Sequence, residues 1–386
     1  MTQPRTFKIT PQDTLFFRDG RPFNQSDEGL ARAHSHFPPF PCTMSGAVRR
    51  ALAEARGWRH GPWSPELQAI LGDGPDDMGP LTFGPPTPVC AANGRLETLH
   101  PVPLALLGHA TREGYCRLAP GAPLQSDLGQ AVSLPQLPEG SGPGWKPLSD
   151  TWVTAGGLTR FLKGSVPQKE EMLLADDLWP QESRIGLARC YQTRAARKGM
   201  LYATSHVRLR DDIMLALEVH GLPGDWPCPR VMPLGGEGRF GWVEELSAVL
   251  PQPEAPDSLR CAGQRMFYTV VLLSPLCPPD EAWRKPGGTL PQLPGLIVSA
   301  CLERMTLIGG WNSAGYGGQP AGPRPLRPFL PAGSVFFMEM AASSEQKAAV
   351  LKRHLTAIGE ETRHGFGRMA IGTYAGREEA ASPCVA

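Results

Sequence analysis

The glycine-rich stretch Gly365–Gly372, with the sequence GFGRMAIG, is the segment near the C-terminus best suited to binding chemistry. Glycines let a backbone approach a phosphate or ribose closely and present its N–H groups. Arg363 and Arg368 would then flank the resulting concavity. The stretch follows a predicted helix and enters a predicted strand, which is the reverse of a dinucleotide-binding fingerprint. It therefore predicts either a nucleic-acid contact or a tight helix-to-strand turn.

Two further segments combine glycine with cations or aromatic rings. The cluster Gly309–Gly318 contains Trp311, whose ring could stack on a base or could fill the core beneath a loop. The segment Thr193–Tyr202 contains three cations, Arg194, Arg197 and Lys198. Arg and Lys side chains supply most phosphate contacts, although an exposed hairpin tip would explain the same pattern.

A helix is expected from Thr43 to Arg56, with Thr43 as its N-cap. Arg49 and Arg50 lie off its expected apolar stripe. The free N–H groups at its start, around Thr43–Gly46, could bind a phosphate or could be capped in the ordinary way.

Residues suited to enzyme catalysis are sparse. Among nine His, the close pair is His34 and His36, which could act as acid and base in metal-independent RNA cleavage or could be polar loop residues. No P-loop, HExxH or GxSxG motif is present. The nine Cys form no CxxC pair, which favours reduced thiols in a cytoplasmic protein without a structural zinc. Without these motifs we expect no metal and no cofactor. The N-terminus lacks an apolar signal core and no run approaches the roughly 18 apolar residues of a membrane span, so we expect no membrane segment.

Composition favours a loop-rich globular protein. Hydrophobic residues make up 41% of the 386 residues, and 44 Gly plus 42 Pro predict many turns. The net charge is only +1, yet Arg184–Arg210 holds seven basic and no acidic residues. Such segregation indicates basic grooves on a neutral protein, or else a solvated surface.

The elements expected from periodicity give an α+β fold. The second half reads as strand 266–274, helix 296–308, strand 334–340, helix 343–358 and strand 369–374. This order approaches the βαββαβ ferredoxin-like unit, with one strand left to be found, for which the loop 309–333 is a candidate. The segment 251–263 resembles a linker, which predicts domains at 1–255 and 256–386. An irregular insertion is expected at about 108–180, and Asn93-Gly94 predicts a hairpin turn.

Several blocks together resemble a known family. They are Thr14–Phe23, Phe37–Pro41, Ser45–Arg49, Arg184–Gly186, Thr193–Tyr202, Gly235–Arg239, Gly309–Trp311, Pro331–Ser334 and Gly365–Arg368. In this order they are similar to the third subunit of the Cmr complex, a RAMP-superfamily protein of type III-B CRISPR systems.

The resemblance implies two ferredoxin-like (RRM-like, RAMP) domains with glycine-rich loops. It implies a non-catalytic subunit that anchors the 5′ repeat-derived handle of crRNA. Its partners would be the large palm-domain subunit and the backbone RAMP subunits. The candidate RNA-binding residues are Arg18, Arg21, Ser45, Arg49, Arg194, Arg197, Lys198, Arg239, Trp311, Arg363, Gly365, Phe366, Gly367 and Arg368. The alternatives are a metal-independent crRNA-processing endoribonuclease and a pure protein–protein adaptor.

Overall fold

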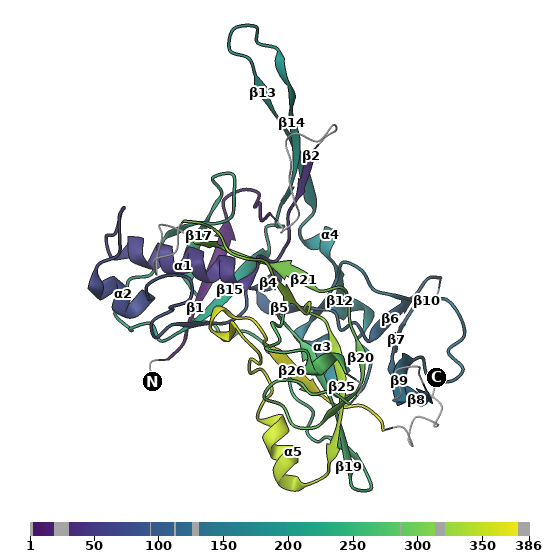
Figure 1. The fold of residues 1–386 in the computed structure, drawn as a ribbon. Helices are drawn as coiled ribbons and strands as arrows, with labels where there is room; N and C mark the ends of the chain where they lie inside the picture. The colour runs from purple at the N-terminus through teal and green to yellow at the C-terminus, as the bar shows by residue number, and fades with distance from the viewer. Residues whose placement is uncertain are drawn as a thin grey trace. The chain divides into compact units, whose positions relative to one another are not determined.

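The computed structural model describes residues 3–18, 31–92, 94–111, 113–125, 131–285, 287–312 and 321–376, without the side chains of 31, 32 and 198–200 (Figure 1). The fold is mixed α+β, with many strands and few helices. Contacts divide the chain into two units of three segments each. Unit 1 comprises Met1–Leu96, Ala175–Val249 and Leu307–Arg327, and unit 2 comprises Glu97–Leu174, Leu250–Thr306 and Pro328–Ala386.

These units differ from contiguous halves divided at residue 255. The difference arises because the segment Glu97–Leu174 packs into the same core as the C-terminal strands. Leu158 and Phe161, for example, belong to one buried cluster with Val335 and Phe337. Hydrophobic burial therefore joins segments that are far apart in sequence.

Unit 1 is built on an antiparallel sheet with the strand order β4-β15-β1-β17-β16. Its strands are β1 (Arg5–Pro11), β3 (Thr82–Phe83), β4 (Thr87–Ala92), β15 (Ile213–His220), β16 (Val231–Pro233) and β17 (Phe240–Glu245). Phe7 and Ile9 of β1 are fully buried, whereas Thr6, Lys8 and Thr10 are partly exposed. This alternation is that of a strand with one face on the core.

Helix α1 (Pro41–Ala55) packs on that core through Met44, Val48 and Leu52. The helix begins earlier than predicted, because Pro41 suits the first helical position and Phe40 occupies the cap. Thr43 as N-cap is therefore wrong. Arg49 also departs from the prediction, since it is buried. The second helix, α2 (Pro65–Leu71), is capped by the Ser64 side chain.

A long hairpin, β13 (Gln181–Arg189) and β14 (Ala196–Val207), extends away from the rest of unit 1 (Figure 1). Strand β2 (Ala31–His34) runs parallel to β14 near the base of the hairpin. The hairpin tip that was one explanation of the segment Thr193–Tyr202 is therefore present. Gly186 faces Tyr202 across the ladder, and a side chain at this glycine would collide with the tyrosine ring.

Unit 2 contains an antiparallel sheet in which β19 lies between β25 and β26, and β20 pairs with β25. Its strands are β18 (Arg260–Ala262), β19 (Arg265–Leu272), β20 (Leu296–Cys301), β25 (Val335–Ala341) and β26 (Met369–Gly372). Helix α5 (Ser344–Leu351) is shorter than the predicted 343–358, and the Ser343 hydroxyl caps it.

The predicted helix at 296–308 is wrong, because its first half is strand β20. Ile297, Ser299 and Cys301 are buried and their neighbours are more exposed, which is the period of a strand. The strand missing from the predicted order therefore lies here.

The segment expected to be an irregular insertion, 108–180, contains regular structure. Within it, strand β11 (Thr151–Thr154) pairs with β12 (Met172–Leu174), and α3 (Ala155–Leu162) follows β11. On its other side β11 pairs with β5 (Arg95–Pro101), which precedes the segment. The segment 251–263 also packs, since the His354 Nε2 lies 2.8 Å from the Pro253 carbonyl. The remaining elements are α4 (Ala175–Leu178), β6 (Leu106–His109), β7 (Tyr115–Arg117), β8 (Ala119–Gln125), β9 (Ala131–Gln136), β10 (Trp145–Pro147), β21 (Thr306–Ile308), β22 (Trp311–Asn312), β23 (Gly322–Pro323) and β24 (Arg327–Phe329).

At the predicted hairpin turn, Gly94 has a φ of +73°, as such a turn needs, and residue 93 lies outside the described residues. In the described ranges, no helix is long and apolar enough to cross a membrane.

Candidate nucleic-acid interface

Three segments far apart in sequence meet at the base of the β13–β14 hairpin. The N–H groups of Leu15 and Val207 donate to each other's carbonyls, both at 2.8 Å. The Gly236 N–H donates to the Phe16 carbonyl at 2.8 Å. Gly235 has a φ of +84°, and a Cβ there would lie 2.4 Å from the same carbonyl oxygen. The glycine pair therefore allows one backbone to lie directly against another.

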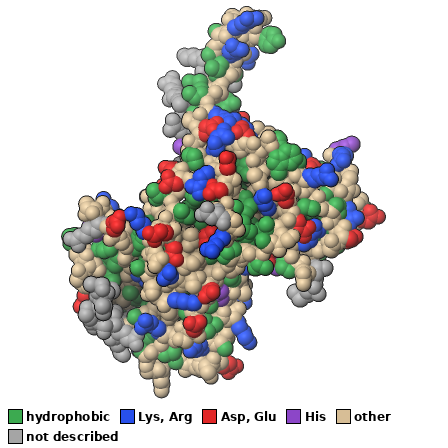
Figure 2. Space-filling view, turned by 180° about the vertical axis from the view of Figure 1, so that it is seen from behind, with side chains coloured by type: hydrophobic (Ala, Val, Ile, Leu, Met, Phe, Trp, Pro, Cys, Tyr) green, Lys and Arg blue, Asp and Glu red, His purple; other side chains and the backbone are tan. Residues whose placement is uncertain are grey.

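Asp13 is the centre of an ion-pair cluster at this junction. Its carboxylate lies 2.8 Å from Arg239, 3.0 Å from Arg208 and 3.3 Å from Arg184. Glu182 accepts from two of these arginines, at 2.8 Å from Arg184 and 2.7 Å from Arg208. Three guanidinium groups and two carboxylates leave a net charge of +1 on this cluster, which we call the Asp13 cluster. Figure 2 shows acidic and basic side chains intermingled at the base of the hairpin.

The Asp13 cluster is charged at neutral pH. Desolvation opposes ionisation of Asp13, but hydrogen bonds from the Thr14 amide, Arg184 and Arg208 outweigh it and lower the pKa of Asp13 to about 2. The carboxylate thus remains ionised under all ordinary conditions, and it holds the base of the hairpin to segment 13–18.

His206 lies beside this cluster and serves packing. Its ring is buried and stacks on Phe16 with 5.0 Å between centroids. The hydroxyls of Thr14 and Thr204 lie 3.2 and 3.1 Å from its two ring nitrogens. Burial, together with Arg184, lowers the pKa of His206, so the neutral imidazole is favoured.

The tip of the hairpin presents cations and an aromatic ring. Arg189, Arg194 and Arg197 are exposed, and within the described residues none of the three is paired with an acid. Tyr191 is 98% exposed. Figure 2 shows basic and hydrophobic side chains together at the end of the projection. Unpaired guanidinium groups beside an exposed ring are what phosphate and base contacts require. The side chain of Lys198 lies outside the described part.

Tyr191 was missed by the sequence reasoning, although an aromatic residue inside a basic segment is a recognisable signal. The apolar strip on one face of the hairpin was missed too. Ile185, Leu187 and Leu201 are 69%, 47% and 47% exposed. Two adjacent strands carry them, because Leu187 pairs with Leu201.

The N-terminal candidates divide into exposed and buried residues. Arg18 is exposed and its backbone forms an isolated bridge with Ser35. Arg21 lies outside the described residues. Arg49 is 5% exposed and donates to the carbonyls of Leu71, Gly74 and Asp77 at 2.6, 2.7 and 2.8 Å. It therefore holds the loop after α2, and we leave it out of the proposed RNA surface.

Two other candidates belong to unit 1, Ser45 in α1 and Trp311 in β22. Ser45 is fully buried, and its hydroxyl donates to the Cys42 carbonyl at 3.2 Å. The Cys42 thiol in turn donates to the Gly309 carbonyl at 3.6 Å. Trp311 is 65% exposed, so the reading that its ring fills a core is wrong. Most of the glycine cluster after it, 313–320, lies outside the described residues.

The glycine stretch near the C-terminus belongs to unit 2 and is a tight turn. Gly367 has a φ of +71°, and its N–H donates to the Pro275 carbonyl at 2.8 Å. The Arg368 N–H donates to the Ser274 hydroxyl at 2.9 Å. The Gly365 N–H donates to Thr362. These amides are therefore engaged within unit 2 and do not point at a ligand.

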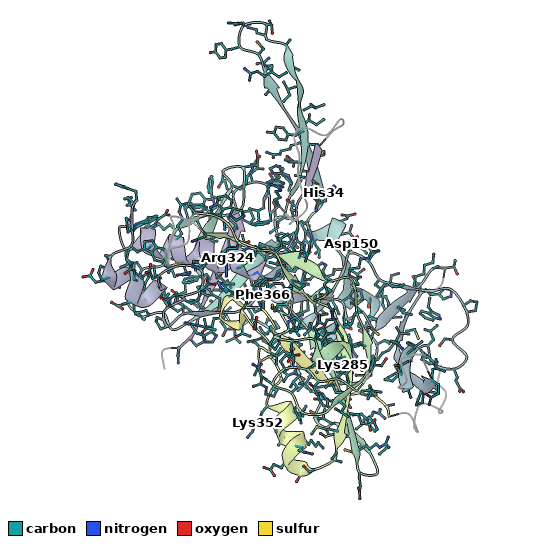
Figure 3. The ribbon with its side chains drawn as sticks, in the orientation of Figure 1. His34, Asp150, Lys285, Arg324, Lys352 and Phe366 are labelled. Atoms are coloured by element: carbon teal, nitrogen blue, oxygen red, sulfur yellow. The ribbon has the colours of Figure 1, made fainter. Side chains whose placement is uncertain are left out.

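Phe366, labelled in Figure 3, is 1% exposed and its ring lies 4.6 Å from that of Phe329. It anchors the turn in the core. Arg363 is exposed and Arg368 is half-buried, so any RNA contact from this stretch would come from those two side chains.

His34 and His36 occupy different surroundings. His34 is exposed on β2, opposite Ser205 of β14 (Figure 3). The His36 ring stacks on Phe40 at 4.2 Å. Across the described ranges there is no group of three or more His, Cys, Asp or Glu placed to hold a metal ion.

The described part of the chain is thus a strand-rich α+β protein with tight glycine turns and a projecting basic hairpin. A family model described as CRISPR-associated protein (Cas_Cmr3) matches residues 7–374. The chain therefore belongs to the Cas_Cmr3 family of CRISPR-associated proteins.

Solved structures similar to this chain include a chain of the type III-B Cmr-beta complex bound to cognate target RNA, seen also with AMPPnP. Both are 15% identical, with 86% of each chain covered and a TM-score of 0.45. A chain of the Csm3–Csm4 subcomplex of the type III-A interference complex is 10% identical, with coverage of 86% of this chain and 92% of that one and a TM-score of 0.37. No curated protein matches this chain. The family assignment therefore rests on the match to residues 7–374.

Proposed function

We propose that the chain is a non-catalytic RNA-binding subunit of a type III-B (Cmr) effector ribonucleoprotein and anchors the 5′ handle of crRNA. The observation that supports this most is the hairpin tip, where Arg189, Arg194 and Arg197 have no acidic partner among the described residues and Tyr191 is exposed. A splayed single strand is bound by phosphate contacts and by stacking on such rings.

The hairpin is suited to this role because its base is fixed. An isolated two-stranded hairpin is marginally stable in water. Here Asp13 and Glu182 hold Arg184 and Arg208 at the base, so the tip can carry unpaired cations without losing its position. The basic residues of the segment thus divide into paired residues that fix the hairpin and unpaired residues that meet RNA.

Both sheets support the proposal of two ferredoxin-like domains. In unit 1, β1 lies between β15 and β17, with β4 beyond β15. In unit 2, β19 lies between β25 and β26, with β20 beyond β25. Each first strand is thus flanked by the third and fourth strands, as in an antiparallel βαββαβ unit. Unit 1 has the helix after the first strand, and unit 2 has the helix before the fourth.

A neutral protein with one basic projection suits a subunit that meets proteins over the rest of its surface. We therefore extend the proposal to a cytoplasmic subunit that bridges the large palm-domain subunit to the backbone RAMP subunits. The proposal needs no cofactor.

Binding of handle-containing RNA, compared with a scrambled RNA, tests the proposal by fluorescence anisotropy at several salt concentrations. The double variant Arg194→Ala, Arg197→Ala should bind the handle at least tenfold more weakly. Its log–log salt slope should fall by about 1.4, at ~0.7 for each lost single-strand phosphate contact. Arg284→Ala is the matched control, since Arg284 is half-exposed and paired with Glu281.

Three results would contradict the proposal. Equal affinity for handle and scrambled RNA, in the isolated chain and in the assembled complex, would favour a protein–protein adaptor. A double variant that behaves like the control would remove the tip as the RNA surface. Cleavage of repeat RNA in EDTA, abolished by His34→Ala or His36→Ala, would establish the nuclease instead.

A further inference from the structure

An exposed apolar patch lies on the outer face of the unit 1 sheet, at its β16 edge. Phe240 and Trp242 of β17 are 38% and 49% exposed, and Val231 of β16 is 39% exposed. Val231 pairs with Trp242, and the exposed Pro233 pairs with Phe240. The alternate residue of β17, Val243, is buried in the core. The four exposed side chains form one cluster, which we call the β16–β17 patch.

The patch is preorganised for burial. The Trp242 indole N–H donates to the Gln12 side-chain carbonyl, and the Gln12 N–H donates to the Phe240 carbonyl at 3.1 Å. The two rings meet edge to face, with 6.3 Å between centroids and an interplanar angle of 83°. A buried Trp needs a partner for its N–H, and a donor left unpaired costs binding energy. Trp242 already has this partner, so a second surface can cover it without that cost.

The charges around the patch distinguish its occupant. Lys8 pairs with Glu244 at 2.9 Å, and Arg5 donates to Glu245 at 2.8 Å. RNA would need unpaired cations here to neutralise its phosphates. Arg230, directly before β16, is exposed, and in the part of the chain described no acid is paired with it. A single free cation beside an apolar centre is typical of the rim of a protein interface.

We propose that the β16–β17 patch is a docking site for another polypeptide of the same ribonucleoprotein. That partner presents aliphatic side chains to Phe240 and Trp242 and a carboxylate to Arg230. The inference rests on the proposed function, in that it requires an assembly of which this chain is a subunit. It deepens that proposal by locating a protein-binding face apart from the hairpin tip.

Incorporation of the chain into the complex reconstituted with crRNA tests the inference. The measurement is the chain concentration for half-incorporation, by mass photometry. Trp242→Ala should raise it about 30-fold, the effect of a residue whose loss costs about 2 kcal/mol at an interface. Gln12→Ala should raise it about tenfold, because the indole N–H would be buried without a partner. Val249→Ala is the matched control, since Val249 is 95% exposed and outside the patch.

Circular dichroism melting verifies that each variant is folded, and Gln12→Ala tests the patch should Trp242→Ala unfold. Incorporation of both variants at the control concentration would overturn the inference. So would loss of handle affinity in isolated Trp242→Ala, which would show that the patch stacks on RNA. An isolated chain that dimerises through Trp242 would also overturn it, in favour of a second copy. Exclusion of Trp242→Ala from the complex, with no handle preference in the isolated chain, would uphold the patch and refute only the proposed RNA role.

Discussion

Gly367 is the position where a single methyl group should do the most damage to unit 2. Its φ is +71°, a conformation that costs a residue with a Cβ about 1–2 kcal/mol. The added Cβ would lie 1.9 Å from the Ile358 carbonyl oxygen, which is fixed backbone. Relief of such overpacking costs roughly 1–3 kcal/mol more. We therefore expect Gly367→Ala to lower the free energy of unfolding by about 2–5 kcal/mol.

Gly263→Ala is the matched control, because Gly263 has a φ of +56° in the same unit and nothing within 4 Å of its Cβ position. It should lose only the conformational part, about 1–2 kcal/mol. Urea denaturation, with hydrogen exchange followed at β19 and β26, measures both variants. Equal loss in the two variants would refute the reasoning, because the close approach to Ile358 would then contribute nothing.

The remaining predictions concern charge. Asp13→Asn should lower the thermal midpoint at low salt. It should lower the midpoint less at 1 M salt, where the screening length is about 3 Å. An equal decrease at the two salt concentrations would contradict the ion-pair role. The pKa of Asp13 is depressed to about 2, so its contribution is complete above about pH 4 and is lost as pH falls through 2. Burial, with a smaller effect of Arg368, lowers the pKa of His100 to about 4. Between pH 6.5 and pH 4 the His100 imidazole is protonated in the unfolded chain and neutral in the folded chain, so stability falls as the pH falls. Urea denaturation should show the free energy of unfolding decreasing by up to about 3 kcal/mol over this range, and His100→Asn should not show this decrease.

Some strands are recognisable in the sequence. Arg5–Pro11 alternates apolar and polar residues, and Ile213–His220 begins with five consecutive apolar residues. The hairpin that was one explanation of the basic segment is present. The strand Leu296–Cys301 was predicted as a helix because its Val, Ser and Ala residues also fit an amphipathic helix. Its partner β25 lies more than thirty residues later in the chain, and no local pattern reveals that pairing.

The residue types of the candidate site could be predicted from the sequence, but the exposure of each side chain could not. Arg49 and Arg194 look alike in sequence, yet one donates to three carbonyls inside unit 1 and the other lies on an exposed tip. The difference depends on the loop after α2, which folds back over the helix. The charged partners of Arg239 could not be foreseen either, because Asp13 is more than two hundred residues away.

The two glycine turns show why glycine-rich segments suggested backbone contacts with RNA, and which contacts their glycines make instead. Gly236–Arg239 and Gly365–Arg368 both read Gly-x-Gly-Arg, and each leads directly into the last strand of its sheet, β17 or β26.

Each turn also donates an N–H to the segment that follows the first strand. Gly236 donates to Phe16 after β1, and Gly367 donates to Pro275 after β19. The two contacts use different positions of the pattern, because the donor is the first glycine in unit 1 and the second glycine in unit 2. The glycines make these backbone contacts, and the arginine side chain at the end of each turn makes other contacts. Arg239 lies in the Asp13 cluster, and Arg368 lies beside the buried His100.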